Sequence, residues 1–221
     1  MPTQADHPNI HSLLGLHPSS PLLIQFLQFL ANEMTPVPIP KIYPDAVYFN
    51  YYTLGLSLLF IPQPGFKPNP TRKLSEYDND KLVLDSIYLY NTPPKLVNAT
   101  AGSGVIGRAE QAFSAFALLP LELELAVDNK NKDGNVVTRP QKVEITREGS
   151  GKDFVRVLGE PDRKGGGVGP TSGSIGIWCE WTQNGIMVEF GGEEAIGPGA
   201  WERGKDAVWK TITLFAPQGN I

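Results

Sequence analysis

The amino-acid sequence predicts an α+β fold in which two tandem β-α-β-β-β units form one compact domain. The first observation behind this prediction is that residues 51–60 match residues 181–190, with Gly55 lying 130 residues before Gly185. Two further pairs of segments match in the same order at similar spacings, residues 26–30 with 154–158 and residues 84–90 with 209–215. Self-similarity at a nearly fixed spacing indicates an internal duplication. If the duplication is real, we expect Gly55 and Gly185 to lie in tight hairpin turns.

Composition limits the class of protein. With 221 residues, of which 41% are apolar, the chain is long enough to bury a substantial core. A net charge of −4 argues against nucleic acid as a main partner, since such proteins present a clustered basic face. Cys179 is the single cysteine, and no charged-then-apolar leader opens the chain, so we expect a cytoplasmic protein. The longest apolar runs are too short for a transmembrane segment.

The first residues predict an N-terminal arm. We assign residues 1–18 to this arm, expect it to be loosely packed, and place a first short strand at residues 14–16. His7 and His11 have a spacing that chelates metals on a helix, but Pro8 lies between them and no cysteine or carboxylate cluster follows. We therefore expect no metal site.

The first unit spans residues 19–91. Ser20 as the cap and Pro21 at the first helical position predict a helix over residues 21–33. Apolar residues then alternate at a period of two, which is typical of strands. The predicted strands cover residues 47–52, 56–60 and 82–90.

Residues 92–140 match neither unit and are predicted to be an insertion or connector that is partly disordered. Within it, Leu121, Leu123 and Leu125 alternate with two glutamates, which predicts a half-exposed strand.

The second unit spans residues 141–217. A short strand at residues 143–145 precedes a helix that Ser150 and Asp153 begin and that Gly159 followed by a proline ends. Three strands follow, near residues 174–182, 185–190 and 207–215. Each unit has one helix for one face of an antiparallel sheet, so we expect the units to bury the remaining surface against each other.

The glycine-rich loop at residues 159–173 is the first candidate site. Glycine-rich backbone can bind phosphate, but here Lys164 precedes the glycines and a strand follows, unlike a Walker loop. We expect a mobile connector. The alternative is contact with an anion or lipid headgroup through Arg163 and Lys164.

The loop around Trp201 is the second candidate. In one interpretation the Trp201 ring folds back over the sheet and the neighbouring charges pair locally. In the other, Trp201 and Arg203 are an interface anchor, a residue pair typical of binding hot spots, and the ring is then largely exposed.

No catalytic set is evident in the sequence. Gly-x-Ser-x-Gly is absent, and Cys179 lies within a predicted strand, where a buried and inert thiol is expected. We therefore predict no catalytic residue, cofactor or metal ligand. The alternative is a small-ligand or enzyme site in a groove between the units, where Glu180, Trp181 and Tyr52 meet.

Residues 49–60, Phe-Asn-Tyr-Tyr-Thr-Leu-Gly-Leu-Ser-Leu-Leu-Phe, resemble a hairpin of the eukaryotic phagosome assembly factor family. The Leu-Gly-Glu-Pro sequence at residues 158–161 resembles the helix end of BamE-like repeats. The resemblance covers residues 45–61, with weaker support at 152–161 and 184–190. It implies a noncatalytic adaptor linked to autophagy or membrane trafficking, which joins a propeller-type protein and contacts phosphoinositide membranes peripherally.

We therefore predict a noncatalytic protein-binding or adaptor module. It would use the exposed sheet surface or the loops at residues 159–173 and 191–206. The candidate partner contacts are Trp201, Arg203, Arg163 and Lys164.

Overall fold

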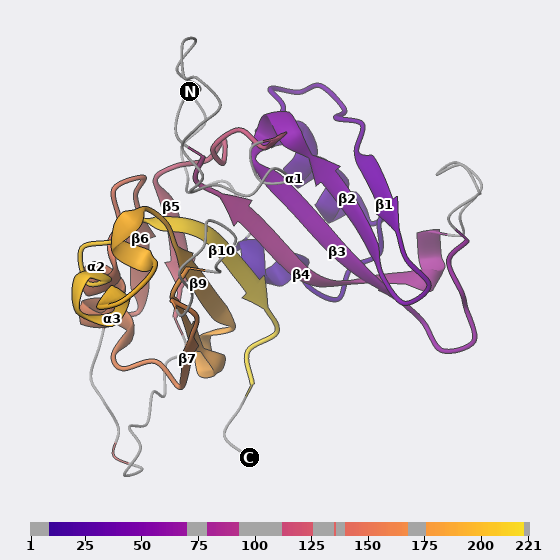
Figure 1. Cartoon of the computed structure of the whole chain (residues 1–221). Coiled ribbons are helices and arrows are strands. Elements are labelled where there is room, and N and C mark those ends of the chain that lie inside the picture. The colour runs from indigo at the N-terminus through magenta and orange to yellow at the C-terminus, as the bar shows by residue number, and fades with distance from the viewer. Residues whose placement is uncertain are drawn as a thin grey trace.

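An eight-stranded antiparallel sheet runs through the whole molecule (Figure 1). The structure is a computed structural model and describes residues 9–69, 79–92, 112–125, 135, 140–167 and 176–218. In these residues the sheet is accompanied by a two-stranded hairpin and three α-helices, so the α+β class is confirmed. The helices are α1 (Pro21–Leu30), α2 (Gly151–Leu158) and the single turn α3 (Ala200–Arg203).

The strand order of the large sheet is β1-β2-β3-β4-β10-β9-β8-β7. Its first four strands are β1 (Ile39–Ile42), β2 (Val47–Tyr51), β3 (Leu56–Pro62) and β4 (Leu82–Tyr90). The other four are β7 (Arg163–Gly165), β8 (Trp178–Trp181), β9 (Ile186–Phe190) and β10 (Trp209–Phe215). The separate hairpin consists of β5 (Leu121–Glu124) and β6 (Lys142–Ile145). We call residues 9–92 the N-terminal half and residues 140–218 the C-terminal half.

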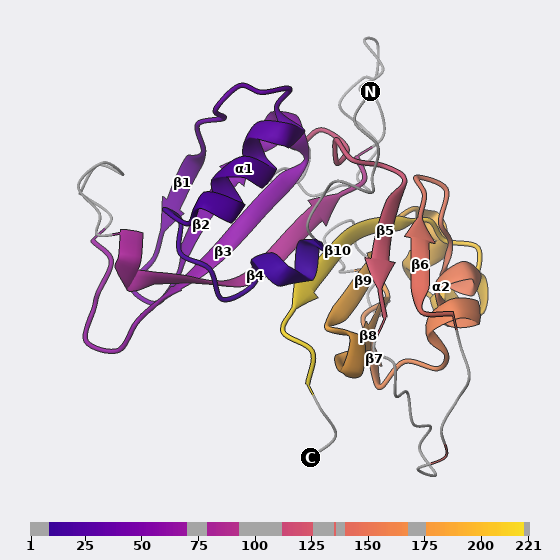
Figure 2. The same ribbon diagram turned by 180° about the vertical axis from the view of Figure 1, so that it is seen from behind.

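Both long helices cover the same face of the sheet, which we call the helix face. Viewed from behind, α1, α2 and the β5–β6 hairpin all lie in front of the strands (Figure 2). In the C-terminal half, the Phe154 ring of α2 lies 6.4 Å from the Trp181 ring and 6.0 Å from the Phe190 ring, centroid to centroid. These contacts bury the apolar side of the amphipathic helix, which is the main source of its stability.

The opposite side of the sheet, which neither α1 nor α2 covers, is called the open face (Figure 2). Because side chains alternate along a strand, residues paired across neighbouring strands share one face. One such row crosses six strands and contains Asn50, Ser57, Tyr88, Thr213, Met187 and Glu180. The open face is therefore polar and tyrosine-containing, in contrast to the apolar helix face, which carries aliphatic side chains as well as phenylalanine and tryptophan rings.

The two halves meet where β4 pairs with β10, and Figure 1 shows the two colour ranges meeting there. Tyr88 lies opposite Thr213 at the centre of this pairing. On either side, Ile87 pairs with Leu214 and Leu89 pairs with Ile212. The units thus join edge to edge in one sheet, whereas the sequence led us to expect them to pack against each other and bury their surfaces.

Gly55 and Gly185 both lie in hairpin turns, as predicted. Each follows one turn of 3-10 helix, η3 (Tyr52–Leu54) or η7 (Thr182–Asn184), and each has left-handed backbone, with φ of 63° and 61°. The strands on either side are paired, β2 with β3 and β8 with β9.

Several predicted element bounds are corrected. The first helix ends at residue 30, because Asn32 and Glu33 have positive φ values and so leave the helix. The short edge strands β1 and β7 were missed, since Pro40 and Gly165 lie in them and neither strand is long enough to show a period of two. As a result α1 precedes four strands in the N-terminal half and α2 precedes four strands in the C-terminal half, where α3 lies between the last two.

The N-terminal segment from residue 9 is packed, contrary to expectation. It forms a 3-10 helix, η2 (Ile10–Leu13), whose two end residues are buried. The Gly15 N–H donates to the Leu84 carbonyl, and the Leu84 N–H donates to the Leu16 carbonyl, so residues 14–16, predicted as a strand, are hydrogen-bonded to β4 without forming one.

The predicted strand in the connector is confirmed as β5, with its leucines buried and its glutamates exposed. The disorder predicted within residues 92–140 falls mainly outside the described residues. In the part of the chain that the structure describes, no helix is both long and apolar enough to cross a bilayer.

Candidate functional site

A pocket of about 200 Å³ lies on the helix face of the C-terminal half, between α2 and α3. Its floor is formed by Ile177, Cys179 and Phe190, all of which are buried. Trp201 forms part of its wall, so we call it the Trp201 pocket. The full lining comprises Gly151, Lys152, Val155, Glu160, Pro161, Lys164, Ile177, Cys179, Phe190, Trp201, Gly204 and Lys205.

Two glycines allow the walls of the pocket to approach closely. A Cβ on Gly151 would overlap the carbonyl oxygen of Gly204, and a Cβ on Gly204 would overlap the Ile177 side chain. The Gly151 N–H donates to the Ala207 carbonyl at 3.0 Å, and the Lys152 N–H donates to the Lys205 carbonyl at 2.8 Å. The first N–H groups of α2 are thus already used within the protein, and ligand recognition falls to the side chains.

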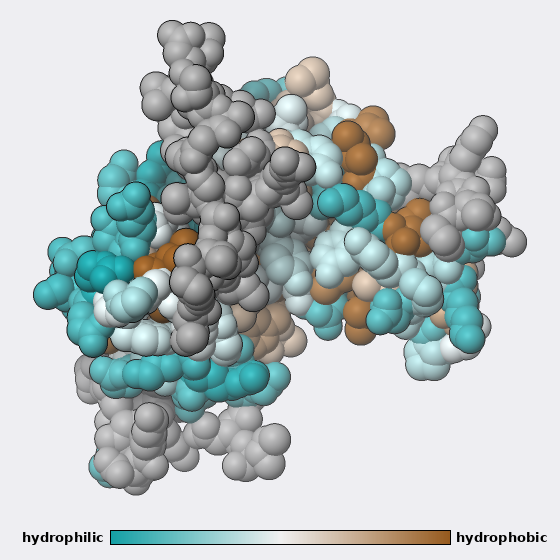
Figure 3. Space-filling view, in the orientation of Figure 1, coloured by the Kyte–Doolittle hydropathy of each residue, from teal (hydrophilic) through white to brown (hydrophobic). Residues whose placement is uncertain are grey.

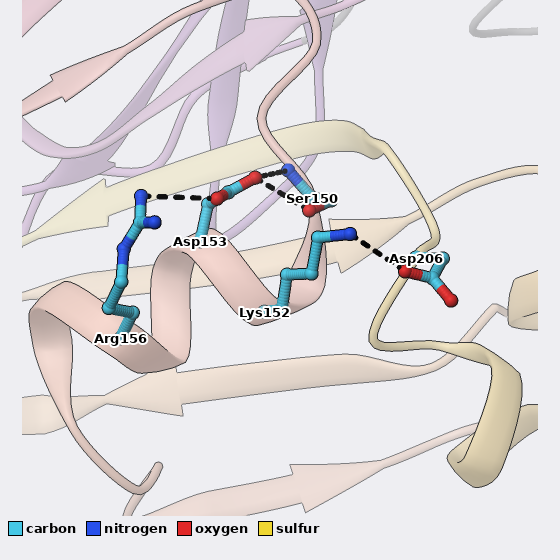
Figure 4. Close-up of polar contacts among 5 residues, drawn as sticks. All are labelled: Ser150, Lys152, Asp153, Arg156 and Asp206. Carbon is cyan, nitrogen blue, oxygen red and sulfur yellow. Dashed lines mark hydrogen bonds and ion pairs between the residues drawn. The ribbon is translucent and has the colours of Figure 1, made fainter.

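The start of α2 is fixed by a capping box (Figure 4). Ser150 donates its hydroxyl and its backbone N–H to the Asp153 carboxylate, at 2.6 and 3.1 Å. These bonds, aided by Arg156, lower the pKa of Asp153, so the carboxylate stays charged.

Lys152 joins α2 to the chain that follows α3. Its ammonium lies 2.9 Å from the Asp206 carboxylate (Figure 4). The hydrogen bond raises the pKa of Lys152 and lowers that of Asp206, so both groups stay charged at neutral pH.

Trp201 is half-exposed at the rim of the pocket. The side chain keeps 42% of its surface accessible, and the Lys164 ammonium lies 5.4 Å from its ring centroid. This distance is within the range of a cation–π interaction. The ring therefore neither folds fully into the core nor is largely exposed, so the structure does not decide between the two interpretations, and the interface anchor stays a prediction.

Arg203 holds the loop that precedes α3 in place. Its guanidinium donates to three backbone carbonyls, those of Pro198 (2.7 Å), Ile196 (2.9 Å) and Glu193 (3.3 Å). These bonds hold the loop between η8 (Glu193–Ala195) and α3. We therefore assign Arg203 a structural role.

Replacing Arg203 by alanine should lower the free energy of unfolding by about 1 kcal/mol, because three carbonyls lose a charged donor at a partly solvated site. Chemical denaturation measures this change. The control is Arg156→Ala, which removes an exposed (i,i+3) ion pair with Asp153 and should cost a few tenths of a kcal/mol. Equal effects of the two substitutions would contradict the structural role.

Arg163 and Lys164 point to opposite faces of the sheet. Arg163 pairs with Glu180 across β7 and β8, and its guanidinium contacts that carboxylate at 3.3 Å on the open face. Lys164 pairs with Cys179 and faces the Trp201 pocket. The two cations do not form a joint anion site. Residues 163–165 of the predicted connector are a strand, and residues 168–175 lie outside the described residues.

The predicted groove between the units is not formed by its three proposed residues. Trp181 is buried and donates its indole N–H to the Gly159 carbonyl at 2.8 Å. The Tyr52 ring contacts the Phe113 ring at the end of β2, at 4.5 Å between centroids. Because β3, β4, β10 and β9 lie between β2 and β8, Tyr52 is remote from Trp181 and Glu180.

Cys179 is buried, as predicted, and burial raises the pKa of its thiol to about 11. A protonated thiol is a weak nucleophile, so this floor residue contributes packing. Among the described residues, no group of three or more histidine, cysteine or acidic side chains lies close enough to hold a metal ion.

Sequence reasoning found Trp201 and Lys164 but missed Lys152 and Lys205. Lys152 follows Gly151 and Lys205 follows Gly204, the glycines at which α2 and the end of α3 approach each other. These two glycines were the signal in the sequence that could have pointed to the lysines. Comparison with protein-family models, curated proteins and solved structures found no match for this chain.

Proposed function

We propose that the protein is a noncatalytic protein-binding module that receives a bulky apolar side chain, carried on an acidic segment of a partner, in the Trp201 pocket. The observation that carries this proposal is a half-exposed tryptophan beside an apolar floor, with lysines at the rim. Tryptophan in such a setting is typical of a binding anchor.

The volume of the pocket favours a single side chain. Sites for drug-sized molecules usually measure about 300–1,000 Å³. The Trp201 pocket, at about 200 Å³, is smaller. Burial of an aliphatic or aromatic group against its apolar floor contributes roughly 25 cal/mol of binding free energy per Å² of apolar surface.

The charges at the rim favour an acidic partner. Lys152 forms an ion pair with Asp206. The other charged residues that line the pocket are two lysines, Lys164 and Lys205, and one acidic residue, Glu160. The rim is therefore net positive although the whole chain carries −4. Such local complementarity accelerates association and selects partners by charge.

The experiment selects binders from a random peptide display library and measures their affinity by fluorescence anisotropy. We expect enriched peptides with a large apolar residue between aspartates or glutamates. Trp201→Ala should weaken binding at least about tenfold, as loss of a hot-spot residue does. Lys164→Ala should weaken it roughly fivefold, and more strongly at low salt.

Arg163→Ala is the matched control, because Arg163 is an exposed cation next to Lys164 in sequence but on the other face. It should leave peptide affinity unchanged. The proposal is wrong if no peptide is enriched on the folded protein, or if Arg163→Ala and Lys164→Ala have the same effect.

We also propose that the two halves arose by internal duplication. At the spacing of 125 residues, Ile87 corresponds to Ile212, and Leu89 corresponds to Leu214. Across β4 and β10, Ile87 pairs with Leu214, the counterpart of Leu89, and Leu89 pairs with Ile212, the counterpart of Ile87. This exchange is what a two-fold axis between the halves requires. In the sheet, β1 to β4 follow one another inward from one edge, and β7 to β10 follow one another inward from the other edge. This symmetric strand order and the left-handed backbone of both Gly55 and Gly185 support the same origin.

The duplication relates the Trp201 pocket to a pocket of about 170 Å³ beside α1. Leu27, Phe49 and Phe60 line the pocket beside α1. At the spacings of 128 and 130 residues their counterparts are Val155, Cys179 and Phe190, which line the Trp201 pocket. The two pockets therefore occupy corresponding places.

The paired pockets differ in charge. Ile24 lines the pocket beside α1 at the position that corresponds to Lys152, and no lysine lines that pocket among the described residues. The acidic partner is thus assigned to the C-terminal half alone. The resemblance of residues 45–61 to the phagosome assembly factor family supports autophagy or membrane trafficking as the setting of this adaptor.

A further inference from the structure

A second, larger cleft lies on the open face of the N-terminal half and has a volume of about 410 Å³. It is remote from the Trp201 pocket, which lies on the helix face of the other half. We call it the tyrosine cleft. Its lining comprises Lys41, Tyr43, Asp45, Ala46, Tyr48, Asn50, Ser57, Tyr90 and Phe113.

Aromatic rings form the walls of the tyrosine cleft. Tyr43 and Tyr48 meet edge to face with centroids 5.9 Å apart. Tyr90 stacks on Phe113 at 3.9 Å. Such rings offer flat apolar surfaces, and the tyrosines add a hydroxyl at the edge. The surrounding surface over β1 to β3 is largely polar with scattered apolar residues, so the cleft is not part of a broad apolar patch (Figure 3).

The floor of the cleft is polar and buried. Asn50 and Ser57 are only 5% and 1% exposed. The Ser57 hydroxyl donates to Asn50 Oδ1 at 2.8 Å, and Asn50 Nδ2 donates to the Ile39 carbonyl at 3.0 Å. An amide has two N–H donors and a hydroxyl has two lone pairs. Counted over the described residues, these bonds leave one N–H of Asn50 and the lone pairs of Ser57 unused.

The rim carries one cation and one anion, Lys41 and Asp45. These charges offset each other, so the cleft does not select a charged ligand by net attraction.

We propose that the tyrosine cleft binds a pyranose ring of a neutral carbohydrate. The C–H groups of a sugar face pack against aromatic walls, while a sugar hydroxyl both donates and accepts hydrogen bonds. Such a hydroxyl matches the donor of Asn50 and the acceptor of Ser57 together. The volume accommodates one to two rings, in the usual range for small-ligand sites.

A proline-rich peptide is the main competitor, because such peptides dock between aromatic rings. Proline has no backbone N–H, so a polyproline segment has acceptors only and leaves the Ser57 acceptor unmatched. A buried polar atom without a partner weakens binding. The floor therefore favours the sugar.

The test is saturation-transfer NMR on the whole chain with the methyl glycosides of glucose, galactose, mannose and N-acetylglucosamine, and with cellobiose, maltose and lactose. We expect transfer to the C–H protons of one ring face for at least one of these probes. Tyr43→Ala should weaken its affinity about tenfold, and Ser57→Ala should weaken it about threefold to tenfold. Tyr43 is half-exposed, so its substitution leaves a folded protein even if that of Ser57 does not.

Trp201→Ala is the control, since Trp201 lies outside the tyrosine cleft, and the substitution should leave sugar binding intact while it weakens peptide binding in the Trp201 pocket. The absence of sugar binding in the tyrosine cleft and the absence of peptide binding in the Trp201 pocket can therefore be distinguished. The proposal is overturned if none of the probes binds, if Tyr43→Ala has no effect on the probe that binds, or if oligoproline displaces that probe and binds more tightly.

Discussion

Replacing Gly185 by alanine is expected to lower the free energy of unfolding by more than about 3 kcal/mol, because two independent costs add. The residue has φ of 61°, a conformation that side chains with a Cβ rarely adopt. The new methyl group would also overlap the Phe215 carbonyl oxygen and lie 3.0 Å from the Pro217 nitrogen, both of which are backbone atoms. Neither neighbour can rotate away, so the end of β10 must shift.

Denaturant titration followed by tryptophan fluorescence measures this loss. Gly65→Ala is the matched control, since Gly65 also has a positive φ, of 86°, but no atom within 4 Å of its added Cβ. It should cost about 1 kcal/mol, the conformational strain alone. A loss at Gly185 no larger than that at Gly65 would show that the turn does not pack as described.

Gly55→Ala is expected to behave like Gly185→Ala. Its φ is 63°, and the added Cβ would lie 2.5 Å from backbone atoms of Ala115 and Phe116. The blocking segments differ: they are the connector at Gly55, and the last residue of β10 with the chain after it at Gly185. Similar losses would therefore reflect the turn that the two halves share, which is the feature that the proposed duplication explains.

Strong local signals made the hairpin turns and the starts of α1 and α2 predictable from sequence. A glycine between two alternating apolar runs requires a turn at Gly55 and at Gly185. Ser150 with Asp153 three residues later is a capping box, and the structure contains it. Each of these signals is complete within a few residues, so it can be recognised without knowledge of any distant contact.

The Trp201 pocket was not predictable as a whole because its parts are distant in sequence. Lys152 and Lys205 become neighbours through a backbone hydrogen bond between α2 and the chain after α3. Arg203 is the last residue of the single turn α3, and nothing in the sequence shows that three carbonyls accept hydrogen bonds from it. The face to which a lysine in a three-residue strand points is likewise set by pairing with β8.

The second large expected effect on the free energy of unfolding is at Trp181, which is buried, whereas Trp201 is half-exposed. Trp181→Ala should cost about 3–5 kcal/mol, the usual range for deleting a large buried aromatic side chain. Trp181 is 2% exposed and stacks near Phe154, so its removal leaves a cavity between β8 and α2. Trp201→Ala should cost less than about 1 kcal/mol, because the exposed part of its ring is already solvated.

Trp181→Phe separates packing from hydrogen bonding at the same position. Phenylalanine keeps most of the apolar volume but has no N–H for the Gly159 carbonyl, which Trp181 now contacts at 2.8 Å. We expect an intermediate loss of about 1–3 kcal/mol, the cost of an unpaired polar group and a partial void. The readout is the midpoint of chemical denaturation for all three variants. If Trp201→Ala proved as destabilising as Trp181→Ala, Trp201 would belong to the core, and its assignment as a binding anchor would be lost.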